Sequence, residues 1–528
     1  MDFQKYQAST CVLQELGFAL EYGRMGIPES FFKEKEPLLR KAFAEMQKLE
    51  AGAIANPDEN RRVGHYWLRA PQLAPDEAIR GQIDSALFRI IAFAKKIHKD
   101  GKFKNYLLIG IGGSALGPEF AAQALDMGEK NALSPFFLDN TDPDGIDIIL
   151  KNLDLRKTLV IVVSKSGSTP ETRNGMMETQ AAFREEKIDF ARNAVAITQE
   201  GSQLDQLAIR QGWLERFPMW DYVGGRTSIT SAVGLLPMAL QGIEIDEFIK
   251  GAASMDASTR RENFRDNPSA LMALSWLHAT GGVGAKAMVV LPYKDRLALF
   301  SKYLQQLVME SLGKAFDLDG KRVHQGLAVY GNKGSTDQHA YVQQLRDGIN
   351  NFFVTFIEVQ KEREGKFFEV ENDITSADYL QGFCLGTAVA LEEGFRQSMT
   401  IIIAKLSPFS VGMLVALFER AVGLYASLIN VNAYHQPGVE AGKKAAAGIL
   451  ALKSSVVELL KKSPQPMGIE EIALKLEAQN KADVIYRILE RVCMNDGYGI
   501  KKSTEAKNPF NSKYHYEAPS SAPHPGRA

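Results

Sequence analysis

Residues 160–174 read VIVVSKSGSTPETRN, and this stretch decides the fold class. Its first four residues are apolar and β-branched, which is typical of a buried strand in a parallel sheet. A turn rich in hydroxyl groups follows, and Gly167 within it tolerates backbone angles that other residues avoid. The stretch therefore predicts a strand, a tight turn and a helix in succession.

The turn offers donors suited to a phosphate ester, and we call residues 164–172 the phosphate cradle. Backbone N–H groups at the helix N-terminus, the Lys165 ammonium and several hydroxyls converge on one small volume. The hydroxyls belong to Ser164, Ser166, Ser168, Thr169 and Thr172. Thr169 would cap the helix with Pro170 at its first position. Ser168 would instead place Glu171 in a capping box, and the sequence does not decide between the two caps. An ordinary capped turn that binds no ligand is a further alternative.

The bulk composition of the 528-residue chain is that of a globular protein too long for one core. Lys plus Arg (62) balance Asp plus Glu (63), so no overall field attracts nucleic acid or acidic membranes. Three distant cysteines favour a reducing compartment, and neither a signal-peptide pattern nor an uncharged apolar stretch of membrane-spanning length is evident. We therefore expect a cytoplasmic protein that binds neither nucleic acid nor a membrane.

Strand-like runs followed by helical segments recur through both halves of the chain, at 106–109, 136–138, 194–198, 287–292, 352–357 and 400–403. This alternation predicts an α/β protein with two domains, whose largely parallel sheets are flanked by helices. The expected divisions are a helical N-terminal segment at 1–50, α/β domains at 51–250 and 251–448, and a helical appendage with a disordered tail at 449–528. The appendage resembles a helix-turn-helix or winged helix, but its mixed charges argue against DNA reading.

A glycine-rich turn, GIGGSA at residues 110–115, permits two interpretations. It fits the looser G-x-G-x-x-G/A fingerprint, and Asp139 follows about one βα unit later, so a nicotinamide dehydrogenase is an alternative. In the other interpretation, this turn and the cradle bind the same phosphate, and Gly113 and Ser114 donate hydrogen bonds to it.

Two more motifs stand where chemistry is expected. The paired glycines before Arg226 allow close backbone approach to a ligand, and the arginine presents planar donors to an oxyanion. Gln306 and Glu310 are four apart and share one face of a helix predicted at 300–312, where Glu310 is a candidate base. Each residue also has an ordinary surface role as its alternative.

A histidine and a lysine complete the set of candidates. His339 ends a polar loop and can titrate near neutrality as an acid or base. Lys443 lies early in a helix, where the helix dipole disfavours its charge. The eight histidines form no close-spaced pair, so we predict no protein-bound metal.

Together, these motifs resemble the glucose-6-phosphate isomerase (phosphoglucose isomerase) family over about residues 106–443. The resemblance implies two sugar-isomerase (SIS-type) domains with helical arms, a homodimer with shared active sites, and interconversion of glucose 6-phosphate and fructose 6-phosphate without a cofactor. It also implies a phosphorylated hexose as the substrate, bound by Gly113, Ser114, Ser164, Lys165, Ser166, Thr169, Thr172, Gly225, Gln306 and Gln436.

The resemblance further implies a role for each catalytic residue. His339 and Lys443 open the sugar ring, and the histidine reaches the site from the neighbouring subunit. Glu310 then moves a proton between carbons 1 and 2 through a cis-enediol, while Arg226 stabilises the oxyanion.

Three residues depart from the family pattern. Thr227 stands where an aromatic residue usually follows the arginine, and Tyr434-His435 replaces the usual Phe-Asp before Gln436. These changes put fine specificity in question. A non-catalytic sugar-phosphate regulator, with the appendage as its output module, is the alternative function.

Overall fold

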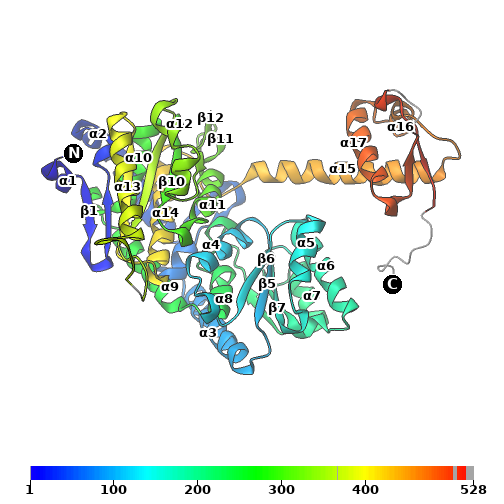
Figure 1. Cartoon of the computed structure of the whole chain (residues 1–528), viewed down its shortest axis with the longest axis horizontal. Coiled ribbons are helices and arrows are strands. Elements are labelled where there is room, and N and C mark those ends of the chain that lie inside the picture. The colour runs from blue at the N-terminus through cyan, green and yellow to red at the C-terminus, as the bar shows by residue number, and fades with distance from the viewer. Residues whose placement is uncertain (1, 366, 504–507, 519–528) are drawn as a thin grey trace. The chain divides into compact units, whose positions relative to one another are not determined.

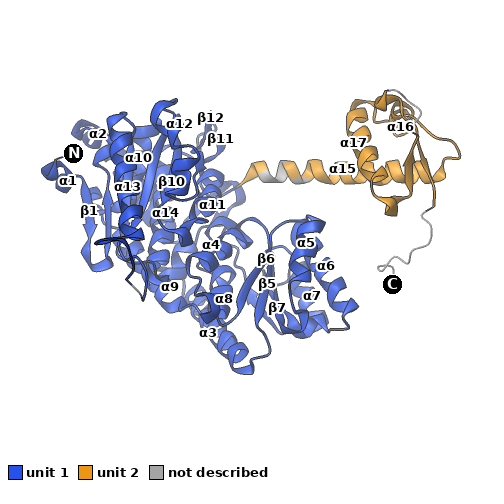
Figure 2. Ribbon diagram, viewed as in Figure 1, with its two compact units in different colours: residues 1–435 blue, residues 436–528 orange. Residues whose placement is uncertain are grey.

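The computed structural model describes residues 2–365, 367–503 and 508–518 (Figure 1), without the side chains of residues 439–441 and 443. The chain forms two compact units, residues 1–435 and residues 436–528 (Figure 2). The predicted disordered tail falls mostly on residues 519–528, which lie outside the described residues.

The first sheet of unit 1 has parallel strands in the order β6-β5-β7-β8-β9. They are β5 (Asn105–Ile109), β6 (Ser134–Leu138), β7 (Thr158–Val163), β8 (Ala194–Thr198) and β9 (Glu215–Pro218). Every residue of β7 is buried, as the unbroken apolar run predicts for a central parallel strand.

The second sheet has the order β1-β2-β17-β14-β10-β13. Its parallel part consists of β10 (Ala287–Pro292), β13 (Val329–Tyr330), β14 (Phe352–Val359) and β17 (Ser398–Ile403). The N-terminal strands β1 (Thr10–Leu13) and β2 (Phe18–Glu21) extend it in antiparallel fashion. The segment predicted as helical therefore holds a hairpin between α1 (Phe3–Ala8) and α2 (Glu29–Glu50), because Cys11, Leu13, Phe18 and Leu20 bury alternate positions.

Helices cover both faces of the two sheets (Figure 1). They are α3 (Glu77–Asp100), α4 (Leu116–Ala124), α5 (Pro143–Lys151), α6 (Pro170–Glu185), α7 (Gln203–Gln211), α8 (Ala232–Gln241), α9 (Ile245–Ser258), α10 (Pro268–Thr280), α11 (Phe300–Leu304), α12 (Val342–Asp347), α13 (Ser376–Glu393) and α14 (Pro408–Leu428). Three short hairpins are β3 (Ile54–Asn56) with β4 (Arg61–Arg62), β11 (Lys314–Phe316) with β12 (Arg322–Gln325), and β15 (Glu369–Glu371) with β16 (Ile374–Thr375).

One apolar core joins the inner faces of the two sheets. Leu108 and Ile161 of the first sheet belong to the same cluster as Val290 and Ile401 of the second, with α8, α9, α10 and α14 between them. By length and composition α14 could cross a membrane, but 94% of its most apolar window is buried inside the protein, so it is a core helix. The outer faces carry α5 to α7 on the first sheet, and α12 and α13 on the second.

Unit 2 has its own small core. It contains α15 (Pro437–Lys462), α16 (Ile469–Lys475), α17 (Ala482–Cys493) and a hairpin of β18 (Ile500–Lys502) and β19 (Tyr514–Tyr516). Val456 and Leu460 of α15 pack with Ile472, Ile485 and Leu489. The helices predicted at 469–478 and 482–494 are present, whereas α15 runs unbroken through the boundary expected at 448.

Candidate active site

The helices that follow β5 and β7 begin without a side-chain cap among the described residues. Asp142 and Ser202 cap α5 and α7, each accepting a backbone N–H of the first turn. The N-cap residues of α4 and α6, Ala115 and Thr169, accept no such bond. Because β5 and β7 are neighbours, both sets of orphan N–H groups lie on one edge of the sheet, where a bound anion would supply the missing acceptors.

The phosphate cradle is held by its own hydroxyls. Ser164 Oγ accepts from Gly167 N (3.0 Å) and donates to Thr169 Oγ1 (3.2 Å), while the exposed Ser166 and Ser168 hydroxyls pair at 2.9 Å. Gly167 has φ 73°, and a Cβ on it would lie 2.3 Å from a backbone nitrogen of α7. Glycine is therefore required there. Thr169 is the N-cap residue with Pro170 first in the helix, which decides between the two capping alternatives.

Three loops of the first sheet meet at this edge. Gly113 of η6 (Gly112–Ser114) is so close to Gly225 that an added Cβ would lie 2.0 Å from the Gly225 carbonyl oxygen. Lys165 Nζ donates to the carbonyl of Asp221 (3.0 Å) and to a second carbonyl two residues on (3.4 Å). Burial lowers the pKa of Lys165, and the Asp221 carboxylate at 3.4 Å opposes this. Lys165 thus joins the cradle, through hydrogen bonds and an ion pair, to the loop that leads to Arg226.

The helix predicted at 300–312 contains a π turn at the candidate base. After α11 the chain continues as η13, which is π-helical over Gln305–Glu310. Such turns recur at functional sites. Gln306 Nε2 lies beside the glycine-rich turn, 3.2 Å from a Cβ built on Gly112. Glu310 Oε2 accepts from Arg226 Nε at 3.2 Å, so both residues face the loops of the first sheet.

Arg226 is deeply buried in η10 (Gly225–Thr227), with 5% of its side chain exposed. Besides Glu310, its guanidinium donates to the carbonyls of Ala433 (3.4 Å) and His435 (3.2 Å). Burial lowers the pKa of Arg226, and the Glu310 carboxylate opposes this. The contact with His435 is made through its main-chain carbonyl, which any residue at this position would provide.

Three other predicted residues belong to separate parts of the chain. His339 is exposed at the end of η14 (Thr336–His339), and no contact among the described residues joins it to Glu310. Gln436 is the N-cap residue of α15 in unit 2. The Lys443 side chain lies outside the described part of the chain. The buried Thr172 and the remaining cradle residues lie on the edge already described.

The sequence did not single out two charged residues that contact Glu310 and His435, respectively. Lys314, 5% exposed, donates from Nζ to the Glu310 carbonyl oxygen at 2.7 Å. Asp58 of η3 (Pro57–Glu59) faces His435 Nε2 at 3.6 Å. Lys314 follows Glu310 by four positions, a spacing that signals helical neighbours. Asp58 carried no such signal, because it lies far away in the N-terminal part of the chain.

A family model described as phosphoglucose isomerase matches residues 36–459. A glucose-6-phosphate isomerase of Geobacter sulfurreducens is 57% identical over 508 residues, covering 94% of this chain and 96% of that protein. A glucose-6-phosphate isomerase of a Cyanothece species is 54% identical over 516 residues, covering 96% and 97%.

Solved structures share the fold as well. The crystal structure of a glucose-6-phosphate isomerase from Chlamydia trachomatis matches with a TM-score of 0.81 at 27% identity, covering 93% of this chain and 94% of that one. A hypothetical protein from Thermus thermophilus matches with a TM-score of 0.70 at 29% identity, covering 82% of this chain and all of its own.

Proposed function

Because the chain belongs to the phosphoglucose isomerase family, we propose that its site interconverts glucose 6-phosphate and fructose 6-phosphate. This aldose–ketose isomerisation is a step of glycolysis and gluconeogenesis. Relatives that cover nearly the whole chain are named for this enzyme, so neither a non-catalytic regulator nor a nicotinamide dehydrogenase is favoured.

We propose that the sugar phosphate binds where α4 and α6 begin. The uncapped N–H groups of both helices, with the cradle hydroxyls, are donors of the kind that a phosphate dianion accepts. Ser114, Ser164, Ser166, Thr169 and Thr172 supply hydroxyls, while Gly113 and Gly225 permit close backbone approach. In this scheme Lys165 holds the cradle against the Arg226 loop and contributes positive charge.

The observation that carries the proposal is the pairing of Glu310 with Arg226 beside this phosphate site. Glu310 is a carboxylate base on a rigid helix, and Arg226 is a fixed cation at 3.2 Å. A substrate seated beside this pair has its C1–C2 end against the base and its developing oxyanion against the guanidinium. Gln306, on the same face as Glu310, is suited to hold a sugar hydroxyl.

Ring opening needs further groups, and we assign it to His339 acting with Lys443, with Gln436 binding the sugar. The described contacts do not bring His339 to its own chain's Glu310, which is the arrangement expected if a second subunit supplies it. These side chains account for every proton transfer in the scheme, so we propose neither a cofactor nor a metal.

An exposed apolar face next to His339 supports a homodimer with shared sites. Apolar side chains of α13, of β15 and of the two residues before β15 are exposed to solvent: Phe367, Phe368, Val370, Tyr379, Phe383, Leu385 and Val389. Gln338, beside His339, donates to the Phe383 carbonyl at 3.2 Å, so the histidine adjoins this face. Exposed apolar side chains gathered on neighbouring elements are typical of a subunit interface.

We propose a cytoplasmic location on the evidence of the thiols. Cys11 and Cys384 are buried as free thiols, and burial raises the pKa of Cys11 to about 11 and that of Cys384 to about 12. Such thiols are compatible with a reducing compartment.

The first test is conversion of fructose 6-phosphate to glucose 6-phosphate by the purified protein in chelator, without nicotinamide, with the product assayed afterwards. Rapid conversion is expected. Binding of the sugar phosphate without turnover would instead establish the regulator.

The shared site has its own test, in which Glu310→Gln and His339→Ala subunits are mixed after dissociation. In random reassortment half of the dimers are hybrids with one complete site each, so about a quarter of the wild-type activity should return. No recovery despite proven subunit exchange would show that each subunit uses its own histidine.

A further inference from the structure

The end of the π turn leaves a main-chain acceptor that the helix itself does not satisfy. Gly313 N donates to Met309 O at 2.8 Å, after which the chain leaves the helix and enters β11 at Lys314. The Glu310 carbonyl is bonded instead by the Lys314 side chain, whose ammonium lies 2.7 Å away. A cation at a helix C-terminus also interacts favourably with the helix dipole. The backbone of the catalytic base is therefore fixed by a charged group one turn further on.

Lys314 lies inside the charge cluster of the active site. Four groups face it: Arg226 of η10, Glu310 of η13, Asp58 of η3 and His435 after α14. Burial, followed by repulsion from Arg226, lowers the pKa of Lys314 to about 8, while Glu310 and Asp58 act in the opposite direction. With its side chain 5% exposed, the ammonium is held among these groups and is not free in solvent.

We propose that Lys314 is a positioning residue for the isomerisation: its ammonium fixes the main chain of Glu310 and, with Arg226, sets the positive field around that carboxylate. This inference rests on the proposed function. It predicts that the charge of Lys314 matters as well as its hydrogen bond. A neutral amine still donates to the carbonyl but no longer supports the negative charge that develops beside Arg226.

The kinetic test compares Lys314→Met with Lys314→Arg. Lys314→Met should lower kcat about 10- to 100-fold, the effect of losing a charge-assisted hydrogen bond and slightly misplacing the base. Its KM should change less than about threefold, because the phosphate cradle does not involve Lys314. Lys314→Arg should recover most of the rate at pH 7.5. Lys321→Met, at an exposed lysine on the neighbouring turn, is the matched control and should behave as wild type.

The pH profile separates positioning from a merely structural role. In the wild type kcat should fall as pH rises past about 8, where Lys314 loses its charge. In Lys314→Arg this fall should move to higher pH, because arginine stays protonated. The proposal is overturned if Lys314→Met keeps the wild-type kcat and pH profile, or if Lys314→Arg is no better than Lys314→Met.

A spectroscopic titration does not depend on turnover. In protein with ¹³C-labelled lysine, the Cε signal lost in Lys314→Arg should titrate near pH 8 and shift to lower pH in Glu310→Gln, which removes a neighbouring negative charge. A protein that shows this titration but does not isomerise the sugar phosphate would refute the proposed function. It would leave the contact between Lys314 and Glu310 supported. A Lys314 signal that does not move in Glu310→Gln would show that the ammonium is not coupled to the carboxylate, and would refute the inference whatever the activity.

Discussion

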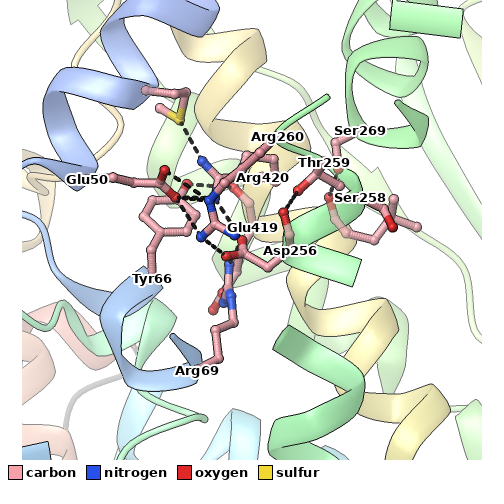
Figure 3. Close-up of polar contacts among 12 residues, drawn as sticks. Glu50, Tyr66, Arg69, Asp256, Ser258, Thr259, Arg260, Ser269, Glu419 and Arg420 are labelled. Atoms are coloured by element: carbon pink, nitrogen blue, oxygen red, sulfur yellow. Dashed lines mark hydrogen bonds and ion pairs between the residues drawn. The ribbon is translucent and has the colours of Figure 1, made fainter. Parts of the chain in front are cut away.

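Replacing Asp256 by asparagine should destabilise unit 1 by several kcal/mol, because this residue is the centre of a buried ion network (Figure 3). Its fully buried carboxylate accepts from Arg69 (3.0 Å), Arg420 (2.7 Å) and Arg260. Glu50 pairs with the last two arginines, and Glu419 with Arg69. The members come from α2, η4 (His65–Arg69), α9 and the turn after it, and α14, so the network joins parts of the chain that are distant in sequence.

The magnitude follows from the charge balance. Above about pH 7, where Glu419 is ionised, three guanidinium groups face three carboxylates. The arginines hold the pKa of Asp256 well below its usual range even though burial alone would raise it. In Asp256→Asn one positive charge is left without a counterion beside the buried guanidinium groups of Arg69 and Arg420. Breaking a buried pair in this way costs about 3–5 kcal/mol. An exposed pair is a matched contrast: Asp147 and Lys151 lie 2.8 Å apart with most of both side chains in solvent, so Asp147→Asn should cost less than about 1 kcal/mol.

The assay is urea unfolding followed by tryptophan fluorescence. All four tryptophans lie within residues 1–435, and Trp67 Nε1 donates to the Glu50 carbonyl at 2.9 Å, so the signal reports on this unit and this network. The double variant Asp256→Asn/Arg260→Met restores the charge balance and should recover more than about 1 kcal/mol of the loss. An Asp256→Asn midpoint no lower than that of Asp147→Asn would refute the reasoning.

Three further predictions concern the site and its pH dependence. Glu310→Gln should lower kcat about 10²–10⁴-fold with KM little changed, as loss of a general base does; steady-state kinetics decide it, and near-wild-type turnover would contradict the assignment. Gly167→Ala should raise KM for the sugar phosphate at least about tenfold, because the Cβ would displace the cradle from α7, whereas Gly101→Ala, also at positive φ but in open space, should leave KM unchanged. Burial raises the pKa of Glu419 to about 7, so the folded state holds a proton that the unfolded state releases. The resulting stability is complete below about pH 4 and is lost as pH rises to about 7. The free energy of unfolding of the wild type minus that of Glu419→Gln should fall across this window, and a flat difference would rule out the shift.

The sequence predicted the parallel strands well because their signal is local. An unbroken apolar run bounded by glycine or a polar turn gave β8 and β10 at their observed bounds, and β7 within two residues. The turn that carries the cradle was predictable for the same reason, since it lies directly after β7. Its role in binding phosphate stays a prediction. The hairpin of β1 and β2 was missed because its partner β17 lies almost four hundred residues away.

The features that escaped prediction depend on distant partners. From the sequence, Asp256 and Arg420 are predicted to be surface residues, because a charged side chain is rarely buried unless it is paired. The sequence does not show which residues pair with them. The π turn at 305–310 leaves the spacing of apolar residues nearly unchanged, so periodicity predicts an ordinary helix. The role of Lys314 likewise becomes visible only where the helix ends at Glu310.

A comparison of the two sheets explains why the proposed phosphate site lies on the first. Both have the same parallel order, with the second strand beside the first and the first beside the third: β6-β5-β7-β8 and β13-β10-β14-β17. Each therefore has a crevice between its first and third strands, where ligands of such folds bind. At the second sheet the helix after the third strand is α13. Its first N–H groups are already bonded to Thr375, whose own N–H bonds to Asp378.

The α6 terminus of the first sheet has no such side-chain cap among the described residues, and it is the one preceded by hydroxyls. A self-capped helix has no orphan donors to offer a phosphate, whatever its dipole. The second half of the chain can therefore supply the base from η13 without a competing anion site. On this reasoning, Thr375→Ala should weaken α13 without affecting sugar-phosphate affinity, whereas changes in the cradle should act on affinity first.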